Sequence, residues 1–139
     1  MTKKPFDLNN PCIFCNPKQE EILAENSFAQ IIQDNSPVSD GHCLIVPKRH
    51  IKTHFEMTAE ENMAIFELMQ TAKEIIHKQG HKPDGYNIGS NNGITAGQSV
   101  FHLHVHIIPR YEGDVEQPKG GIRQVLPSKA MYNLEDRKS

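Results

Sequence analysis

The segment "SVFHLHVHIIPR" at residues 99–110 carries histidines at three alternate positions, His102, His104 and His106. Its β-branched and aromatic residues, with a proline near the end, predict a β-strand. Side chains two residues apart on a strand point to the same face, so the three imidazoles would lie in a row at spacings of about 6.6–7 Å. The apolar residues between them would face the other way and pack into the core.

The remaining elements are separated by turn-forming segments. Strands are predicted at 27–34, 42–47 and 85–90, and the first two flank the turn "NSPVSDG", so they should pair as an antiparallel hairpin. Residues 58–80 predict one long helix, with a capping box at its start and apolar residues at helical spacing. We therefore expect an α+β fold in which an antiparallel sheet of about five strands packs against one long α-helix.

The chain of 139 residues is long enough for one domain with a real core, but short for two. We expect a single domain over 1–139, with its core at 12–110 and a polar loop and C-terminal extension at 111–139. Neither internal repeats nor low-complexity segments interrupt it.

The charge balance excludes several classes of partner. Fifteen basic and seventeen acidic residues give a net charge of −2, which favours neither nucleic acid nor an anionic membrane surface. No apolar run approaches the roughly 18 residues of a membrane span, and "MTKKPFDLNN" lacks the hydrophobic stretch of a secretory signal. Three cysteines do not form a disulfide framework, so we expect a cytoplasmic protein with reduced thiols.

Three interpretations of the histidine row compete. The first is an exposed strand face that happens to carry polar rings. The second is a metal site, since histidines are good zinc ligands, although three successive alternate histidines rarely close on one ion. The third is nucleophilic catalysis, because a neutral imidazole attacks phosphorus at neutral pH and its neighbours can donate hydrogen bonds to phosphate oxygens.

Several spaced motifs, in the same order, resemble the histidine triad (HIT) family of nucleotide hydrolases and transferases. The segment "DNSPVSDGHCLIVPKRHI" at 34–51 is similar to the family's strand-turn-strand unit that ends in Pro-Lys-x-His. The segment "YNIGSNNGITAGQSVFHLHVHIIPR" at 86–110 resembles the family core. The likeness covers roughly residues 12–110, and "GGIRQVLPSKAMY" is more weakly similar to extensions of bacterial members.

The resemblance implies a two-step displacement. His104 would attack the α-phosphate of a purine nucleotide conjugate, such as a dinucleoside polyphosphate or a nucleoside phosphoramidate. Water or another acceptor would then resolve the nucleotidyl-histidine, so one difficult hydrolysis becomes two easier steps. His106 would donate to the phosphate oxygens or to the bridging atom.

The resemblance also implies a nucleotide-binding set. Gln98 and Ser99 would contact the phosphate, Asn91 would support their loop, and Asp34 would receive the ribose hydroxyls, as a carboxylate can. An alternative for Asp34 is a residue that starts a turn by hydrogen bonding its own backbone. Gln98 and Ser99 would likewise be ordinary turn residues in the absence of the histidine row.

The pair Cys12 and Cys15 forms a Cys-x-x-Cys motif, which indicates zinc, redox chemistry or chance. No strand precedes it, unlike a thioredoxin-type redox pair. Some relatives of the family complete a zinc site with the histidines that correspond to His50 and His102. The resemblance therefore implies a closed, structural Cys₂His₂ zinc site here. Without metal, His50 would hydrogen bond to His102 and support it.

Other functions stay open at this point. A phosphorylase or nucleotidyl transferase would use an acceptor other than water. A nucleotide-sensing or scaffold module would bind without turnover, although a decayed site should lose its nucleophile first. Relatives in the family are homodimers, so we expect a homodimer here, and the long helix beside a strand edge would allow it.

Overall fold

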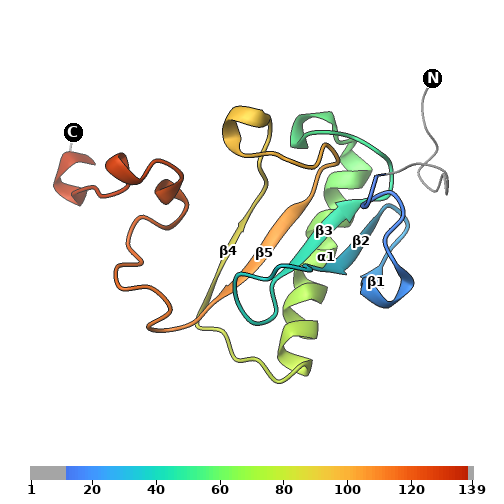
Figure 1. Ribbon diagram of the computed structural model, residues 1–139, viewed down its shortest axis with the longest axis horizontal. Coiled ribbons are helices and arrows are strands. Elements are labelled where there is room, and N and C mark those ends of the chain that lie inside the picture. Colours follow the sequence, from blue (N-terminus) through green and yellow to red (C-terminus); the bar gives the residue numbers. More distant parts are fainter. Residues whose placement is uncertain (1–11, 138–139) are drawn as a thin grey trace.

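A computed structural model of the protein describes residues 12–137, in which five antiparallel strands and one long helix form the body (Figure 1). The sheet has the strand order β1-β2-β3-β5-β4. The bounds of its elements are β1 Ile22–Glu25, β2 Ala29–Gln33, β3 Cys43–Pro47, α1 Ala59–Lys78, β4 Gly85–Gly89 and β5 Val105–Arg110. The predicted α+β class with one antiparallel sheet and one long helix is confirmed.

The helix α1 lies across the back of the sheet in Figure 1 and forms one side of the core, with residues of the sheet and its loops forming the other. Thr58 and Glu61 form the predicted capping box at its start. Its end is set by Gly80, whose φ of 95° is accessible to glycine but strained for other residues. Side chains of the sheet pack against its apolar stripe; among the buried members are Ala29, Ile31, Ile45, Val105, Ile107, Ile65, Leu68, Ala72 and Ile76.

The opposite face of the sheet holds a second, smaller apolar cluster, formed by Phe14, Ile32, Leu44 and Val46. Alternation along β2 and β3 explains the two clusters, because neighbouring residues of a strand point to opposite faces. Phe14 belongs to the segment before β1, so this segment covers part of the sheet face that α1 leaves open. His106 lies on this second face, since it pairs with Leu44 across the β3–β5 ladder.

The predicted strand at 99–110 is shorter in the structure, where only Val105–Arg110 pairs. Both neighbouring ladders end at this point. The β3 pairing with β5 stops at Ile45–Val105, and β4 ends where Gly89 pairs with His106. Residues 99–104 therefore form an irregular approach to β5, fixed by a hydrogen bond of 2.7 Å from the Leu103 amide to the Ile51 carbonyl.

Strand β1 was not predicted by position, although the expected number of strands was right. Its sequence is only Ile-Leu-Ala-Glu, preceded by two glutamates, so no period of two stands out. Pairing with β2 through an irregular register makes it a strand. Tertiary pairing, rather than local propensity, decides such short edge segments.

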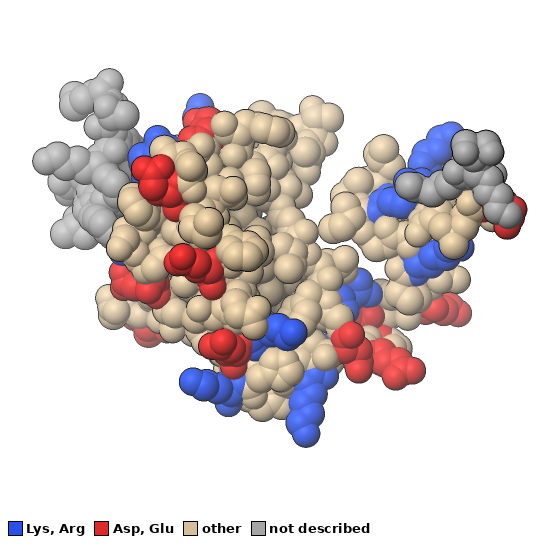
Figure 2. Space-filling model, turned by 180° about the vertical axis from the view of Figure 1, so that it is seen from behind, with Lys and Arg blue, Asp and Glu red and all other residues tan. Residues whose placement is uncertain are grey.

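The segment after β5 leaves the sheet and forms short 3₁₀ turns to one side of the body (Figure 1). These turns span Gly121–Val125, Pro127–Lys129 and Leu134–Arg137. Seen from behind, acidic and basic side chains are interspersed and no continuous basic surface appears on this face (Figure 2). Within residues 12–137, no helix has the length and apolar character needed to cross a membrane.

Candidate functional site

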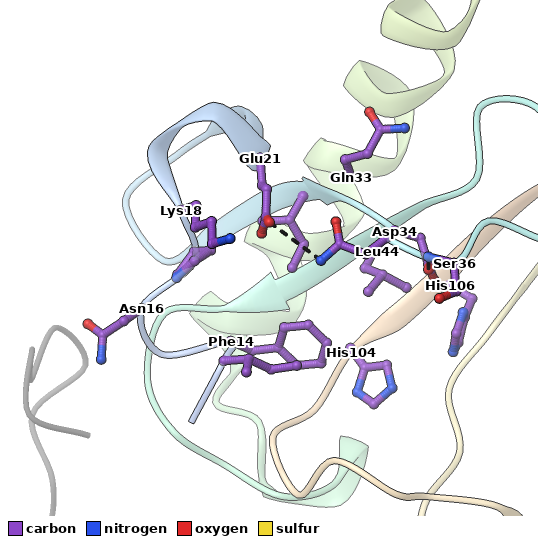
Figure 3. Close-up of a pocket in the computed structure, with 14 residues that line it drawn as sticks. Phe14, Asn16, Lys18, Glu21, Gln33, Asp34, Ser36, Leu44, His104 and His106 are labelled. Atoms are coloured by element: carbon purple, nitrogen blue, oxygen red, sulfur yellow. Dashed lines mark hydrogen bonds between the residues drawn. The ribbon is translucent and has the colours of Figure 1, made fainter. Parts of the chain in front are cut away.

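A cavity of about 420 Å³ opens on the second face of the sheet, between β2, β3, β5 and the segment before β1. His104 and His106 lie side by side in it, with Asp34 and Ser36 next to His106 and Phe14 next to His104 (Figure 3). The ring centroids of the two histidines are 5.2 Å apart. The structure therefore brings together three of the predicted residues, His104, His106 and Asp34.

The tautomer of neutral His104 is fixed by the backbone carbonyl of His102. Its Nδ1 lies 2.8 Å from the carbonyl oxygen of His102, which can only accept a hydrogen bond. Nδ1 must therefore carry the proton, and Nε2 of the neutral ring has a free lone pair. The ring of Phe14 packs against His104 with a centroid distance of 4.9 Å and limits its rotation. The arrangement presents an oriented nitrogen nucleophile.

His106 belongs to a chain of polar contacts with two residues of the preceding hairpin. His42 Nε2 lies 3.0 Å from His106 Nδ1 and 3.3 Å from Asp34 Oδ2. Burial is the main cause that lowers the pKa of both histidines, and Asp34 partly opposes it. Both rings are therefore neutral at neutral pH. Asp34 also accepts a 2.7 Å hydrogen bond from the Ser36 amide, so the turn-forming role holds alongside its place in the cavity.

His102, the first histidine of the row, is fully buried and lies in a cluster with buried Cys15 and half-buried Cys12 and His50 rather than in the cavity. Its Nε2 donates a 2.7 Å hydrogen bond to the Pro47 carbonyl, which leaves Nδ1 of the neutral ring as the unprotonated nitrogen. Burial holds the pKa of His102 at about 4, so the ring stays neutral.

The donor atoms of this cluster suit a tetrahedral ion. His102 Nδ1 lies 3.5 Å from Cys12 Sγ, 3.4 Å from Cys15 Sγ and 3.2 Å from His50 Nδ1. Cys15 Sγ and His50 Nδ1 are 3.1 Å apart. Bond lengths of about 2.3 Å to sulfur and 2.0–2.1 Å to nitrogen give a zinc tetrahedron edges of roughly 3.3–3.8 Å. The predicted four residues meet, and they can hold a metal such as zinc.

The other predicted nucleotide-binding residues do not line the cavity. Gln98 is buried, and its side chain connects loops: it accepts from the Gly93 amide at 2.8 Å and donates to the Lys52 carbonyl at 2.7 Å. Ser99 is exposed. Asn91 lies beside the left-handed Gly97, where a Cβ would come within 3.8 Å of its side chain. All three belong to the loop that leads into the histidine row.

Two residues of the site, His42 and Phe14, were not predicted from the sequence. His42 was not among the predicted site residues, although it stands two and four residues before Leu44 and Val46 and so shares their face of the sheet. That alternation, next to the strand of histidines, was the available signal. Phe14 stands inside the Cys-x-x-Cys motif, so fixing the two cysteines also brings its ring onto His104.

Comparisons with known proteins place this geometry in a family. The HIT domain model matches residues 16–113. Adenosine 5'-monophosphoramidase hnt1 of Schizosaccharomyces pombe is 36% identical over 103 residues, which is 71% of this chain and 74% of the yeast protein. A crystal structure of a HIT family member from Bacillus subtilis superposes with a TM-score of 0.67 at 37% identity, covering 76% of this chain and 77% of the other.

A more distant solved structure has the same fold. The diadenosine triphosphate hydrolase of Plasmodium falciparum, crystallised with cyclomarin A, superposes with a TM-score of 0.65 at 25% identity, covering 80% of this chain and 72% of the other. The family model spans well over half of the 139 residues, and its range contains the histidine row and the Asp34 hairpin. The protein belongs to the HIT domain family.

Proposed function

We propose that the protein is a nucleotide-binding hydrolase that acts at the α-phosphate of a purine nucleotide conjugate. The observation that carries the proposal is the pairing of His104 and His106 in one cavity, with the Nδ1 proton of His104 held by a carbonyl and its Nε2 left as a nucleophile. Asp34 lies in the same cavity and supplies a carboxylate for ribose hydroxyls.

The reaction has two displacements. His104 Nε2 forms a bond to phosphorus while the bond to the leaving group breaks, and the leaving group takes the electron pair. Water then attacks the nucleotidyl-histidine, loses a proton to solvent, and releases the nucleoside monophosphate with the free imidazole. His106 donates a hydrogen bond to the phosphate oxygens or the bridging atom in both steps.

The substrate class is either a nucleoside phosphoramidate or a dinucleoside polyphosphate. The named activities of the yeast and Plasmodium relatives support these two classes, because both break a bond at a nucleotide phosphate. A transferase or phosphorylase that uses another acceptor differs only in the second step. A sensing or scaffold module is the remaining alternative, and the oriented His104 argues against it because binding alone does not need a nucleophile.

Turnover assays separate these alternatives. The purified protein is incubated with a fluorogenic adenosine phosphoramidate and, separately, with diadenosine tetraphosphate. Turnover of either in water that disappears in His104→Ala supports the hydrolase. Turnover that requires added phosphate or another acceptor supports the transferase. Nucleotide binding with no turnover of either substrate contradicts the enzyme and favours the module.

We also propose that Cys12, Cys15, His50 and His102 hold a structural zinc ion. The convergence of two sulfurs and two ring nitrogens supports it. All four positions of a tetrahedron are then filled by protein, so the ion would fasten the N-terminal segment to the histidine row without an open coordination site. Bound metal would add to folding free energy, because the ligands come from three segments.

The loop carrying Asn91, Gln98 and Ser99 is proposed to receive the phosphate. Gln98 supports this through the loop rather than by direct contact, because its amide ties residues 93, 52 and 100 together. Exposed Ser99 is then presented next to the histidine row. Gln98→Ala should therefore loosen the loop and raise KM for the nucleotide.

A homodimer is proposed through the outer edge of the sheet. β4 is the last strand in the order, and its sequence Gly-Tyr-Asn-Ile-Gly has none of the charges or prolines that protect an edge. Ile88 of β4 is 44% exposed, and Phe66 of α1, which lines the same surface hollow, is 67% exposed. A second copy related by twofold symmetry would cover both. Native mass spectrometry should show a dimer that Phe66→Glu dissociates; a monomer at all concentrations would contradict it.

A further inference from the structure

His42 is the one member of the polar chain that the proposed reaction does not use. It lies immediately before β3, and its side chain lies between Asp34 and His106 with only 3% of its surface exposed. A buried imidazole held between two polar side chains needs a reason for its place. Its hydrogen bonds supply one.

The proton on neutral His42 has only one possible position. The backbone amide of Val38 donates to His42 Nδ1 at 3.1 Å, so Nδ1 is an acceptor and carries no proton. A neutral imidazole has one N–H, which must then be at Nε2. A doubly protonated ring would direct an N–H at the Val38 amide, so the backbone also opposes the charged form.

The tautomer of His42 determines the tautomer of His106. The Nε2–H of His42 faces His106 Nδ1 at 3.0 Å, so Nδ1 must accept and cannot hold the proton of the neutral ring. That proton is left on Nε2, the nitrogen turned away from His42. Asp34 Oδ2, at 3.3 Å from His42 Nε2, shares the same hydrogen and keeps the ring of His42 in this orientation. Figure 3 shows His106 next to Asp34 on the wall of the cavity.

We propose that His42 is a positioning residue that holds neutral His106 in its Nε2–H tautomer, so that this ring acts in the cavity as a hydrogen-bond donor. The inference deepens the proposed function and rests on it only for the catalytic consequence. His104 and His106 then present the same nitrogen in opposite protonation states: an unprotonated Nε2 on His104 and an Nε2–H on His106. A backbone group determines each tautomer. The His102 carbonyl fixes that of His104, and the Val38 amide fixes that of His106 through His42.

A neutral donor suits a developing negative charge. Burial lowers the pKa of His106, with further lowering by His104 and His42, so the ring does not need to gain a proton in order to donate. A hydrogen bond from an uncharged imidazole to a phosphate oxygen strengthens as charge accumulates in the transition state. Losing His42 would let His106 exchange between tautomers and would leave the donor present only part of the time.

The test reads the tautomer directly in ligand-free, metal-loaded protein. Long-range ¹H–¹⁵N correlation spectra of histidine-labelled protein at neutral pH distinguish protonated from unprotonated ring nitrogens. We expect His106 with protonated Nε2 and unprotonated Nδ1, His42 in the same tautomer, and His104 in the opposite one. In His42→Leu, His106 should become a mixture of tautomers. In His42→Gln, whose side-chain amide can donate, the Nε2–H tautomer should be largely restored.

Matched controls and kinetics complete the test. His54→Leu removes an exposed histidine and should leave the His106 signals unchanged. In a turnover assay, His42→Leu should lower kcat in proportion to the Nε2–H tautomer that is lost, about twofold for an even mixture, with KM nearly unchanged, and His42→Gln should recover most of the loss. A merely structural role would lower stability without this split and without a change of tautomer.

Three results would overturn the inference: a proton on Nδ1 of His106 in the native protein, an unchanged tautomer in folded His42→Leu, or joint shifts of His42 and His106 on adding Zn²⁺ beyond one ion per chain. The last would mean that an ion bridges the two rings. Because the spectra need no substrate, a protein that turns nothing over but shows the expected tautomers would refute the proposed hydrolase and leave the assignment intact.

Discussion

The two ends of the histidine row, only four residues apart, have different surroundings. His102 is fully buried among sulfur and nitrogen donors, and its ring nitrogen faces Cys12, Cys15 and His50. His104 and His106 line a cavity that Asp34 also lines. The ladder separates His102 from His106: β5 is regular only from Val105, so His102 lies in an irregular segment and can turn toward the cysteines, whereas His106 is paired within the strand. Identical residue types thus serve different purposes according to where the hydrogen bonds of the sheet end.

The largest expected effect is at the cavity end. His104→Ala removes the nucleophile, so turnover should fall by about a thousandfold or more, whereas nucleotide affinity should stay within about tenfold. Steady-state kinetics and equilibrium binding of a nucleoside monophosphate measure the two quantities. Weak binding together with unchanged turnover would reverse the assigned role.

At the buried end of the histidine row, we expect a substitution to lower thermal stability rather than turnover. Cys15→Ser removes one thiolate from the cluster, and the melting temperature should fall by about 10 °C while kcat per folded molecule changes little. Thermal unfolding with and without a strong chelator checks this, and Cys43→Ser, a change at a buried cysteine outside the cluster, controls for lost packing. If chelation abolished activity while the fold persisted, and Zn²⁺ restored it, the metal would be catalytic.

His106→Ala tests the division within the cavity. It removes a hydrogen-bond donor that water can partly replace, so kcat should fall by about 10- to 100-fold, less than for His104→Ala. The covalent intermediate should still form. A larger loss than in His104→Ala, measured on the same substrate, would mean that the two roles are exchanged.

The smallest effect concerns the ribose. Asp34→Asn keeps the size of the side chain and loses its charge, so the preference for a ribonucleotide over its 2',3'-dideoxy analogue should fall by about tenfold in kcat/KM. Ser36→Ala serves as a control, because the hydrogen bond from Ser36 to Asp34 comes from its backbone amide, which the substitution keeps. An unchanged preference in Asp34→Asn would remove Asp34 from the ribose site.

Much of the fold and of the site was predictable from the sequence. The features that were not predictable depend on long-range contacts. The long helix, its capping box and the hairpin of β2 and β3 follow from local patterns that tertiary packing reinforces. The meeting of Cys12, Cys15, His50 and His102 was predicted through the family resemblance and is confirmed in the structure. The break before Val105 was not predictable, because it depends on where two other strands end.

His42 shows the other limit. Its proposed role depends on hydrogen bonds with the backbone amide of Val38 and with the side chain of His106, which is 64 residues away in the sequence. Neither contact produces a local sequence pattern. The same holds for Gln98, whose type suggests a ligand contact but whose amide connects two loops. Long-range hydrogen bonds, unlike periodicity, leave no signature in one sequence.

The central claim is that the cavity end of the row carries the reaction and the buried end does not. Rapid quenching of the protein with an adenosine phosphoramidate, followed by peptide mapping with mass spectrometry, tests it most directly. The account predicts one adenylyl group per chain, on His104, and its loss in His104→Ala. An adduct on His102 or His106, or turnover with no adduct at any quench time, would contradict it.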